Sequence, residues 1–147
     1  GKTPGIQLLQ FDVVPASKEI QQDLFLEDGD FVYEIKRLRT FNDQPFMIET
    51  GYIPIKIAPN LSKATVSGSI FNYLESQGKV VTKSFMSIQA QPSTAEDQTL
   101  LHLKPVEPVG IMEGVFFLDD GTPFEVSNMR LHYQYLNYNT FVSLDEE

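Results

Sequence analysis

The chain has 147 residues, which suits one domain that can fold without a metal or a disulfide. It contains no cysteine, so disulfides, thiolate nucleophiles and cysteine-based zinc sites are excluded, and its two histidines, His102 and His132, cannot form a metal site unaided. Its 11 basic and 20 acidic residues give a net charge of −9, which argues against binding of a nucleic-acid backbone by this chain alone. We see no signal peptide and no apolar run near the roughly 18 residues of a membrane span. The absence of cysteine fits a reducing cytoplasm, so we expect a cytoplasmic protein, and we expect neither a cofactor nor a metal.

The first half of the chain alternates strand patterns with turn residues. In chain order it predicts a strand, a short helix, a strand, a tight turn and a returning strand, at residues 6–17, 17–25, 31–41, 42–45 and 46–54. The helix is indicated by Ile20 and Leu24, which lie four residues apart on one helical face. The segment 53–66, interrupted by Pro54 and Pro59, is predicted to be a loop.

The second half begins with a helix and ends with a hairpin. In chain order it predicts a helix, a long strand, a helix and two long strands, at residues 67–78, 79–91, 93–103, 108–118 and 123–136. Ser67 is the expected N-cap of the first helix, and Gly78 lies just beyond its end. Ser93 and Glu96 have the spacing of a capping box, and residues 139–144 are a candidate for a final edge strand.

Strands dominate this pattern, hairpin-like connections recur, and the helices fall between them. The sequence therefore predicts an α+β fold, a mostly antiparallel sheet with helices on one face, and not a doubly wound parallel sheet. Residues 1–147 are expected to form this domain as one unit.

Two arginines, Arg37 and Arg39, lie two residues apart and so share one face of the predicted strand. If the turn after this strand closes a hairpin, Arg37 falls opposite Glu49. One interpretation is an ion pair at a sheet edge, with both arginines reaching solvent. The other is a pocket in which two guanidinium groups face an anion, while Glu49 holds one of them or accepts bonds from a hydroxyl-rich ligand.

The stretch around Gly68 is a second element that suits an anion. A helix that begins near Ser67 leaves backbone N–H groups without internal partners, and its dipole favours negative charge there. Gly68 permits close approach of a ligand, and the Ser69 hydroxyl adds a donor. A plain capped helix explains the same residues, but two such elements in one domain favour a phosphate site.

The chain resembles the effector-binding (UTRA) domain of GntR-type bacterial transcription regulators of the HutC subfamily. The resemblance lies in four segments that follow the family's order, FVYEIKRLRTFNDQPFMIETGYIP, SGSIFNYLESQGK, IQAQPSTAEDQTLLHL and GVFFLDDGTPFEVSNMRLHYQY. It implies a chorismate-lyase-like α+β fold. It also implies a homodimer that reads a two-fold operator through an N-terminal winged helix-turn-helix domain. Residues 1–147 contain no such segment, so we expect an excised effector-binding and dimerisation domain that meets operator DNA only through the absent part.

The same resemblance implies a binding site for a small anionic effector, such as a phosphorylated sugar or amino sugar. By match to the family's motifs, its residues are Arg37, Arg39, Glu49, Gly68, Ser69, Glu125 and Arg130. The two neighbouring arginines, Arg37 and Arg39, would clamp the phosphate, Ser69 would assist them, and Glu49 would contact the polar body of the ligand.

The sequence departs from the family pattern in two places. Phe71 stands where the family has a tyrosine, so a hydroxyl that could reach the anion is missing. His132 stands where the family has an aspartate after Arg130, and the alignment in that stretch is loose. These departures concern the identity of the ligand more than the existence of the pocket.

Three functions from different classes fit these observations. The first is a non-catalytic ligand sensor that alters DNA binding by another domain. The second is a pyruvate-eliminating lyase on the same fold, whose anionic substrate would also need arginines. The third is a dimerisation module with a vestigial pocket. The absence of a clear acid–base or nucleophile constellation in the sequence favours the sensor.

Overall fold

The structure is a computed structural model that describes residues 3–145. Along these residues the elements are β1 (Pro4–Pro15), α1 (Lys18–Leu24), β2 (Phe31–Phe41), β3 (Gln44–Pro54), α2 (Lys63–Val66), α3 (Ile70–Ser76), β4 (Val81–Pro92), α4 (Ala95–Leu101), β5 (Pro108–Leu118), β6 (Pro123–His132) and the 3-10 turn η1 (Tyr133–Tyr135). No helix within the described residues is long and apolar enough to cross a membrane.

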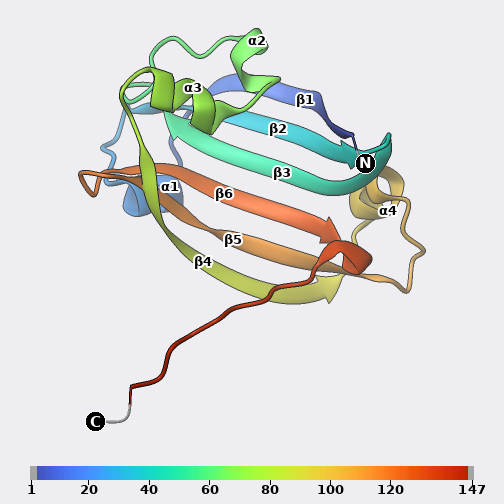
Figure 1. The fold of residues 1–147 in the computed structure, drawn as a ribbon. Helices are drawn as coiled ribbons and strands as arrows, with labels where there is room; N and C mark the ends of the chain where they lie inside the picture. Colours follow the sequence, from blue (N-terminus) through green and yellow to red (C-terminus); the bar gives the residue numbers. More distant parts are fainter. Residues whose placement is uncertain (1–2, 146–147) are drawn as a thin grey trace.

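The strands form one antiparallel sheet in the order β1-β2-β3-β6-β5-β4 (Figure 1). β2 pairs with β3 and β5 with β6 as hairpins, and β6 joins the two halves by pairing with β3. β4, which follows α3, lies at the outer edge beside β5. The prediction of an α+β fold with a mostly antiparallel sheet is confirmed.

The turn between β2 and β3 fixes the register in which these two strands pair. Asn42 and Asp43 alone connect the two strands, with φ angles of 50° and 63°. Two-residue hairpin loops favour positive φ at both positions, and Asn and Asp tolerate it better than most residues. The resulting register places Arg37 opposite Glu49, as the sequence predicts.

Helices cover both faces of the sheet, which corrects the prediction that they lie on one face. The odd-numbered Tyr33 and Ile35 of β2 pack with residues of α2 and α3. The even-numbered Val32 packs with residues of α1, and Leu38 packs with residues of α4. Because side chains alternate across a strand, β2 contributes to apolar clusters on both sides.

The helix starts in the region before β4 also differ from prediction. The segment 53–66 is not only loop, because Ser62 caps the short helix α2 within it. Ser67 does not begin the next helix. It ends α2, and Ser69 is the N-cap of α3. The intervening Gly68 forms the connection between the two helices.

At α4 the predicted capping box lies one residue too early. Thr94 and Asp97 bond each other's backbone reciprocally, whereas Ser93 and Glu96 do not form the box. Thr94 has the extended backbone that an N-cap requires. Residues 139–144 do not add a strand to the sheet within the described chain, and they continue beyond η1 as an irregular segment.

Candidate functional site

A cavity of about 350 Å³ lies between α3 and the odd-numbered face of the sheet. Its lining residues come chiefly from β2, β3, β6 and the start of α3, and they are Ile6, Arg37, Arg39, Glu49, Ser69, Ile70, Phe71, Phe116, Glu125, Ser127 and Met129. Five of the seven predicted site residues are thus brought together, namely Arg37, Arg39, Glu49, Ser69 and Glu125. The two others, Gly68 and Arg130, do not line it.

Arg37 is a buried residue that joins three parts of the chain. Its side chain is 8% exposed, and both Nε, at 2.8 Å, and Nη2 donate to Oε1 of Glu49. Its Nη1 donates to the backbone carbonyls of Val66 at 3.2 Å and Gly68 at 2.8 Å. The guanidinium therefore links β2 to β3 and to the connection between α2 and α3. With all three nitrogens engaged, Arg37 has little capacity left for a ligand.

Arg39 is placed differently, although it lies on the same strand face. Its side chain is 35% exposed, and Nη1 lies 3.5 Å from Oε1 of Glu49, at the limit of a hydrogen bond. It also borders an adjoining cavity of about 350 Å³ that reaches Ser67. A weakly held, partly exposed guanidinium can present a fork of donors to an anion.

Two carboxyl groups face the same cavity. Every hydrogen bond of Glu49 within the described chain goes to Oε1, so Oε2 is available to a ligand. Glu125 is 8% exposed and forms no hydrogen bond with the described residues. Burial and, to a lesser extent, the charge of Glu49 raise the pKa of Glu125, the charge of Arg37 opposes both, and together they place this pKa at about 8. At neutral pH this carboxyl group therefore holds its proton and can donate as well as accept.

Gly51 makes the position of Glu125 possible. A Cβ atom at Gly51 would lie 2.2 Å from Oε2 of Glu125, so the carboxyl group rests against bare backbone. The absence of a side chain on β3 thus lets a β6 carboxyl group occupy the base of the cavity.

Ser69 lies at the start of α3, and its Oγ accepts a hydrogen bond from the amide of Asn72 at 3.2 Å. The hydroxyl proton remains available to the cavity. Within the described residues, the amides of Ile70 and Phe71 also donate to no partner. Gly68 has a structural role instead, because its carbonyl accepts from Arg37.

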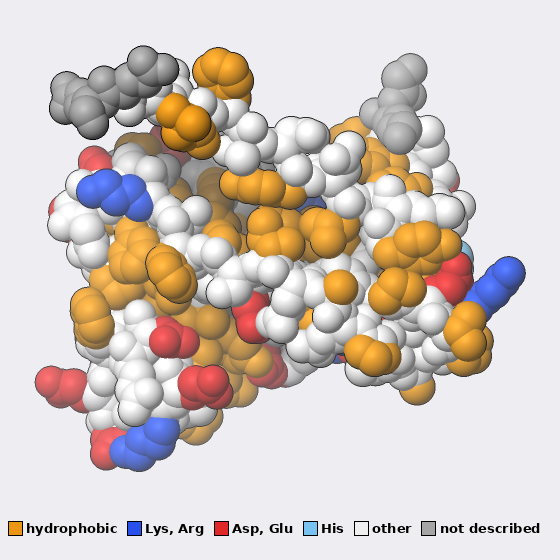
Figure 2. Space-filling view, turned by 90° about the horizontal axis from the view of Figure 1, so that it is seen from below, with side chains coloured by type: hydrophobic (Ala, Val, Ile, Leu, Met, Phe, Trp, Pro, Cys, Tyr) orange, Lys and Arg blue, Asp and Glu red, His pale blue; other side chains and the backbone are white. Residues whose placement is uncertain are grey.

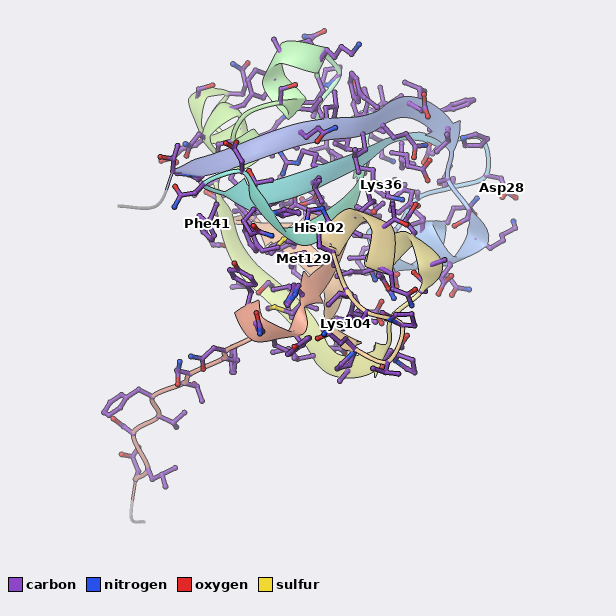
Figure 3. All side chains as sticks on the ribbon, turned by 90° about the vertical axis from the view of Figure 1, so that its right-hand side faces the viewer. Asp28, Lys36, Phe41, His102, Lys104 and Met129 are labelled. Carbon is purple, nitrogen blue, oxygen red and sulfur yellow. The ribbon has the colours of Figure 1, made fainter. Side chains whose placement is uncertain are left out.

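Arg130 lies on the opposite face of the sheet and is not part of the cavity. Its Nε and Nη2 donate to the two oxygens of Asp97, each at 2.8 Å, and so hold α4 against β6. α4 lies in front of the strands in Figure 3. Burial opposes ionisation of Asp97, but the bonds from Arg130 and Thr94 outweigh it, and the pKa of Asp97 is lowered. We therefore leave Arg130 out of the candidate site.

Ser127 and Met129 line the cavity but are absent from the predicted site. Alternation along β6 could have revealed them, because they share the face of Glu125. The same alternation separates Arg130, five residues from Glu125, from that face.

A larger cavity, of about 560 Å³, lies on the face that carries α1. Its lining includes the carboxylates of Glu19, Asp23, Glu34 and Glu113 but no arginine or lysine among the described residues. An anion would be repelled there, so the cavity beside Arg39 is the better candidate for an anionic ligand.

A partly open hollow on one face of the sheet, lined by apolar walls and a few convergent polar groups, is typical of a domain that binds a small molecule. Residues 1–137 match the family described as the UTRA domain, and the chain belongs to this family, the ligand-binding regulatory domain of GntR-family transcription regulators.

Known regulators and structures agree with this assignment. The chain is 25% identical over 126 residues to the HTH-type transcriptional repressor NagR of Bacillus subtilis strain 168, covering 85% of this chain and 52% of NagR. It is 30% identical over 125 residues to the HTH-type transcriptional regulator GmuR of the same organism, covering 84% of this chain and 53% of GmuR. The chain thus spans about half the length of these relatives.

The fold also matches the effector-binding domain of the B. subtilis trehalose repressor, TreR. The two structures have a TM-score of 0.82 at 24% identity, over 97% of this chain and 99% of that domain. At this identity the likeness supports the fold but does not identify the ligand.

Proposed function

We propose that the chain is the effector-sensing domain of a bacterial transcription regulator and that its effector is a phosphorylated sugar or amino sugar. The observation that carries this proposal is the composition of one cavity, which combines the partly exposed cation of Arg39 with two carboxyl groups, Glu49 and Glu125. A ligand that carries both an anion and hydroxyl or amino groups matches that combination. The name of the similar trehalose repressor also connects the fold to a sugar.

In this proposal the two arginines have different roles. Arg39 binds the phosphate, assisted by the Ser69 hydroxyl and the unpaired amides at the start of α3. Arg37 does not clamp the phosphate but positions Glu49, whose free Oε2 accepts from a hydroxyl group of the sugar. Glu125, protonated at neutral pH, bonds a second polar group of the ligand.

The whole regulator acts in the cytoplasm, in this proposal, as a homodimer. Residues 1–147 supply the effector-binding and dimerisation domain, and an N-terminal winged helix-turn-helix supplies the contacts to operator DNA. Two observations support this arrangement: the relatives are named as HTH-type regulators, and the chain spans about half of their length. Effector binding alters the affinity of that second domain for its operator without catalysis by this one.

A thermal-shift screen of phosphorylated sugars, each beside its unphosphorylated form and inorganic phosphate, tests the proposal. A ligand at about 100 times its Kd should add roughly 2.7 kcal/mol of apparent stability. Arg39→Ala should abolish the shift, whereas Lys56→Ala, which removes an exposed cation that does not line the cavity, should keep it. The proposal fails if no phosphorylated sugar raises the melting temperature, or if the unphosphorylated forms raise it equally.

A further inference from the structure

A second cavity, also of about 350 Å³, adjoins the cavity that is proposed to hold the effector. The two are named here the aromatic cavity and the effector cavity. Four apolar side chains line the aromatic cavity, namely Pro4, Ile6, Phe41 and Phe46. Among the described residues that line it, Arg39 is the only charged one. Ile6 and Arg39 line both cavities, and they face each other in the register of β1 and β2, so they form the boundary at which the two spaces meet.

The aromatic cavity owes its wall to an irregularity in the β2–β3 pairing. The register shifts after the pair Arg39–Met47, so that Phe46 has no partner on β2. A bulge of this kind re-aims a side chain. Here the ring of Phe46 stacks on the ring of Phe41, with centroids 4.5 Å apart and planes at 12°. Phe41 lies beside the start of β1 (Figure 3), where its partner in the register is Pro4. The bulge thus builds an aromatic wall next to the cation.

Arg39 can hold an anion at the boundary between the two cavities. Its one hydrogen bond within the described chain is the long contact of Nη1 with Glu49, so Nε and Nη2 keep their donors for a ligand. A phosphomonoester bound there would end at its phosphate and leave the aromatic cavity unfilled. A phosphodiester keeps a negative charge for Arg39 and continues beyond the phosphorus atom through its second ester oxygen.

The two cavities differ in their chemistry. The effector cavity presents the carboxyl groups of Glu49 and Glu125, which suit hydroxyl or amino groups. The aromatic cavity contains no carboxyl group from the described residues and is bounded by the stacked rings of Phe41 and Phe46. Apolar and planar groups gain most from contact with such rings. A polar space on one side of a cation and an apolar space on the other fit a ligand that is divided in the same way.

The other apolar surfaces lack this combination. Seen from the side of β4, the molecule carries several hydrophobic side chains (Figure 2), but no residue of β4 lines the aromatic cavity or the effector cavity. A further apolar cavity, of about 460 Å³ beside Phe31, includes Lys56, but this cation is paired with Asp30 at 3.3 Å. The aromatic cavity therefore stands out because it shares a weakly held cation with the effector cavity.

We propose that the effector is a sugar phosphodiester whose second ester group is aromatic or apolar and occupies the aromatic cavity. The sugar lies beside Glu49 and Glu125, the phosphate lies against Arg39, and the second ester group lies against the stacked rings. Each cavity alone is near the lower end of the roughly 300–1,000 Å³ of small-molecule pockets, so a ligand that spans both is better enclosed. The inference rests on the proposed function, because it keeps the sugar and the phosphate where that function places them.

Binding of two small phosphates tests the second subsite without knowledge of the sugar. Methyl phosphate and phenyl phosphate carry the same anionic group and differ in the group that the aromatic cavity would hold. In calorimetric titration, phenyl phosphate should bind the wild-type chain at least about tenfold more tightly than methyl phosphate, because its ring is buried against aromatic side chains. Arg39→Ala should weaken the binding of both. Equal affinities for the two compounds, or no binding of phenyl phosphate, would overturn the proposal.

Two substitutions show where the phenyl group lies. Phe46→Ala removes one ring of the wall, and Ser67→Phe fills the aromatic cavity from the side of α2. Ser67 is exposed and its hydroxyl donates only to the carbonyl of Lys63, so this variant should stay folded, which circular dichroism checks for both.

Both variants should lose the preference for phenyl phosphate and keep the wild-type Kd for methyl phosphate. The control Phe85→Ala removes an exposed ring that lines neither cavity, and it should keep the preference. A preference that survives in both Phe46→Ala and Ser67→Phe would place the ring elsewhere and refute the second subsite.

The diester linkage is tested with the sugar phosphate that gives the largest thermal shift. Its methyl and phenyl esters carry equal charge, and the phenyl ester should bind at least about tenfold more tightly. If the sugar phosphate binds but its phenyl ester binds no tighter than its methyl ester, the proposed function stands and the phosphodiester is wrong. If phenyl phosphate gains affinity through Phe46 while no sugar phosphate binds, the proposed sugar is wrong and the aromatic subsite stands.

Discussion

Arg37 and Glu49 lie opposite each other on β2 and β3, and two nitrogens of the arginine donate to one oxygen of the glutamate. The pair occupies the buried side of the cavity, where the arginine side chain is 8% exposed and the glutamate 17%. This arrangement leaves Oε2 of Glu49 open. The pair therefore builds the site by orienting a carboxylate, and the arginine that can meet an anion is the neighbouring Arg39.

Arg37→Ala should destabilise the domain and weaken effector binding together. Removing one partner of a buried ion pair typically costs about 3–5 kcal/mol, because the other charge stays buried without compensation. Urea denaturation monitored by circular dichroism measures this loss. The double variant Arg37→Ala/Glu49→Gln should lose less stability than the sum of the losses in the two single variants. An additive loss would show that the stranded charge of Glu49 is not the cause.

Arg39→Ala should leave the fold nearly as stable as the wild type. Its single contact with Glu49 is long and its side chain is one-third exposed, and pairs of this kind contribute about 0–1 kcal/mol. Urea denaturation of the two arginine variants side by side should show a large loss for Arg37 and a small one for Arg39. Equal losses would mean that Arg39 supports the fold and would remove the distinction between their roles.

Glu125→Gln should change how stability depends on pH. The pKa of Glu125 rises from 4.5 to about 8 on folding, so the folded chain holds this proton more tightly than the unfolded chain does. Its contribution to stability is therefore fully present below a pH of about 4.5 and is lost as the pH rises through about 8.

Glutamine does not titrate in this pH range. The unfolding free energy of the variant should therefore fall less than that of the wild type as the pH rises from about 4.5 to about 8. Urea denaturation at several pH values measures both curves. Parallel curves for the two proteins would show that Glu125 ionises normally in the folded state.

Arg130→Ala should lower stability without changing effector affinity. This substitution leaves the almost fully buried Asp97 with only its hydrogen bonds to Thr94 at the start of α4. Losing the partner of a buried charge costs about 3 kcal/mol of stability. Titration of the folded variant with the effector should give the wild-type Kd. A Kd above the wild-type value in a fully folded sample would show that Arg130 contributes to effector binding.

Local patterns were sufficient to predict the β2–β3 hairpin. Alternation placed Arg37 and Arg39 on one face, and the Asn42–Asp43 turn set the pairing with Glu49. Residues 139–144 do not form the predicted edge strand within the described chain. Whether such a segment pairs depends on a surface distant in the sequence, and the local pattern does not report that surface.

Two other errors have physical causes that lie outside local sequence. Neighbouring residues such as Ser67 and Ser69 can both cap a helix, and tertiary packing decides between them. The local sequence also does not indicate which face of a sheet a helix covers. The prediction therefore places all helices on one face, whereas they cover both. Arg130 was different, since its odd separation from Glu125 already indicated the opposite face.

The central claim is that Arg39 reads the phosphate of the effector, and calorimetric titration tests it most directly. The best phosphorylated sugar and its unphosphorylated form are each titrated into the wild type, Arg39→Ala and Lys56→Ala. In the wild type and in Lys56→Ala, the phosphate should tighten binding at least about tenfold, because hydrogen bonds to charged groups contribute about 1.5–3 kcal/mol. In Arg39→Ala this advantage should nearly vanish, whereas an undiminished advantage in that variant would contradict the account.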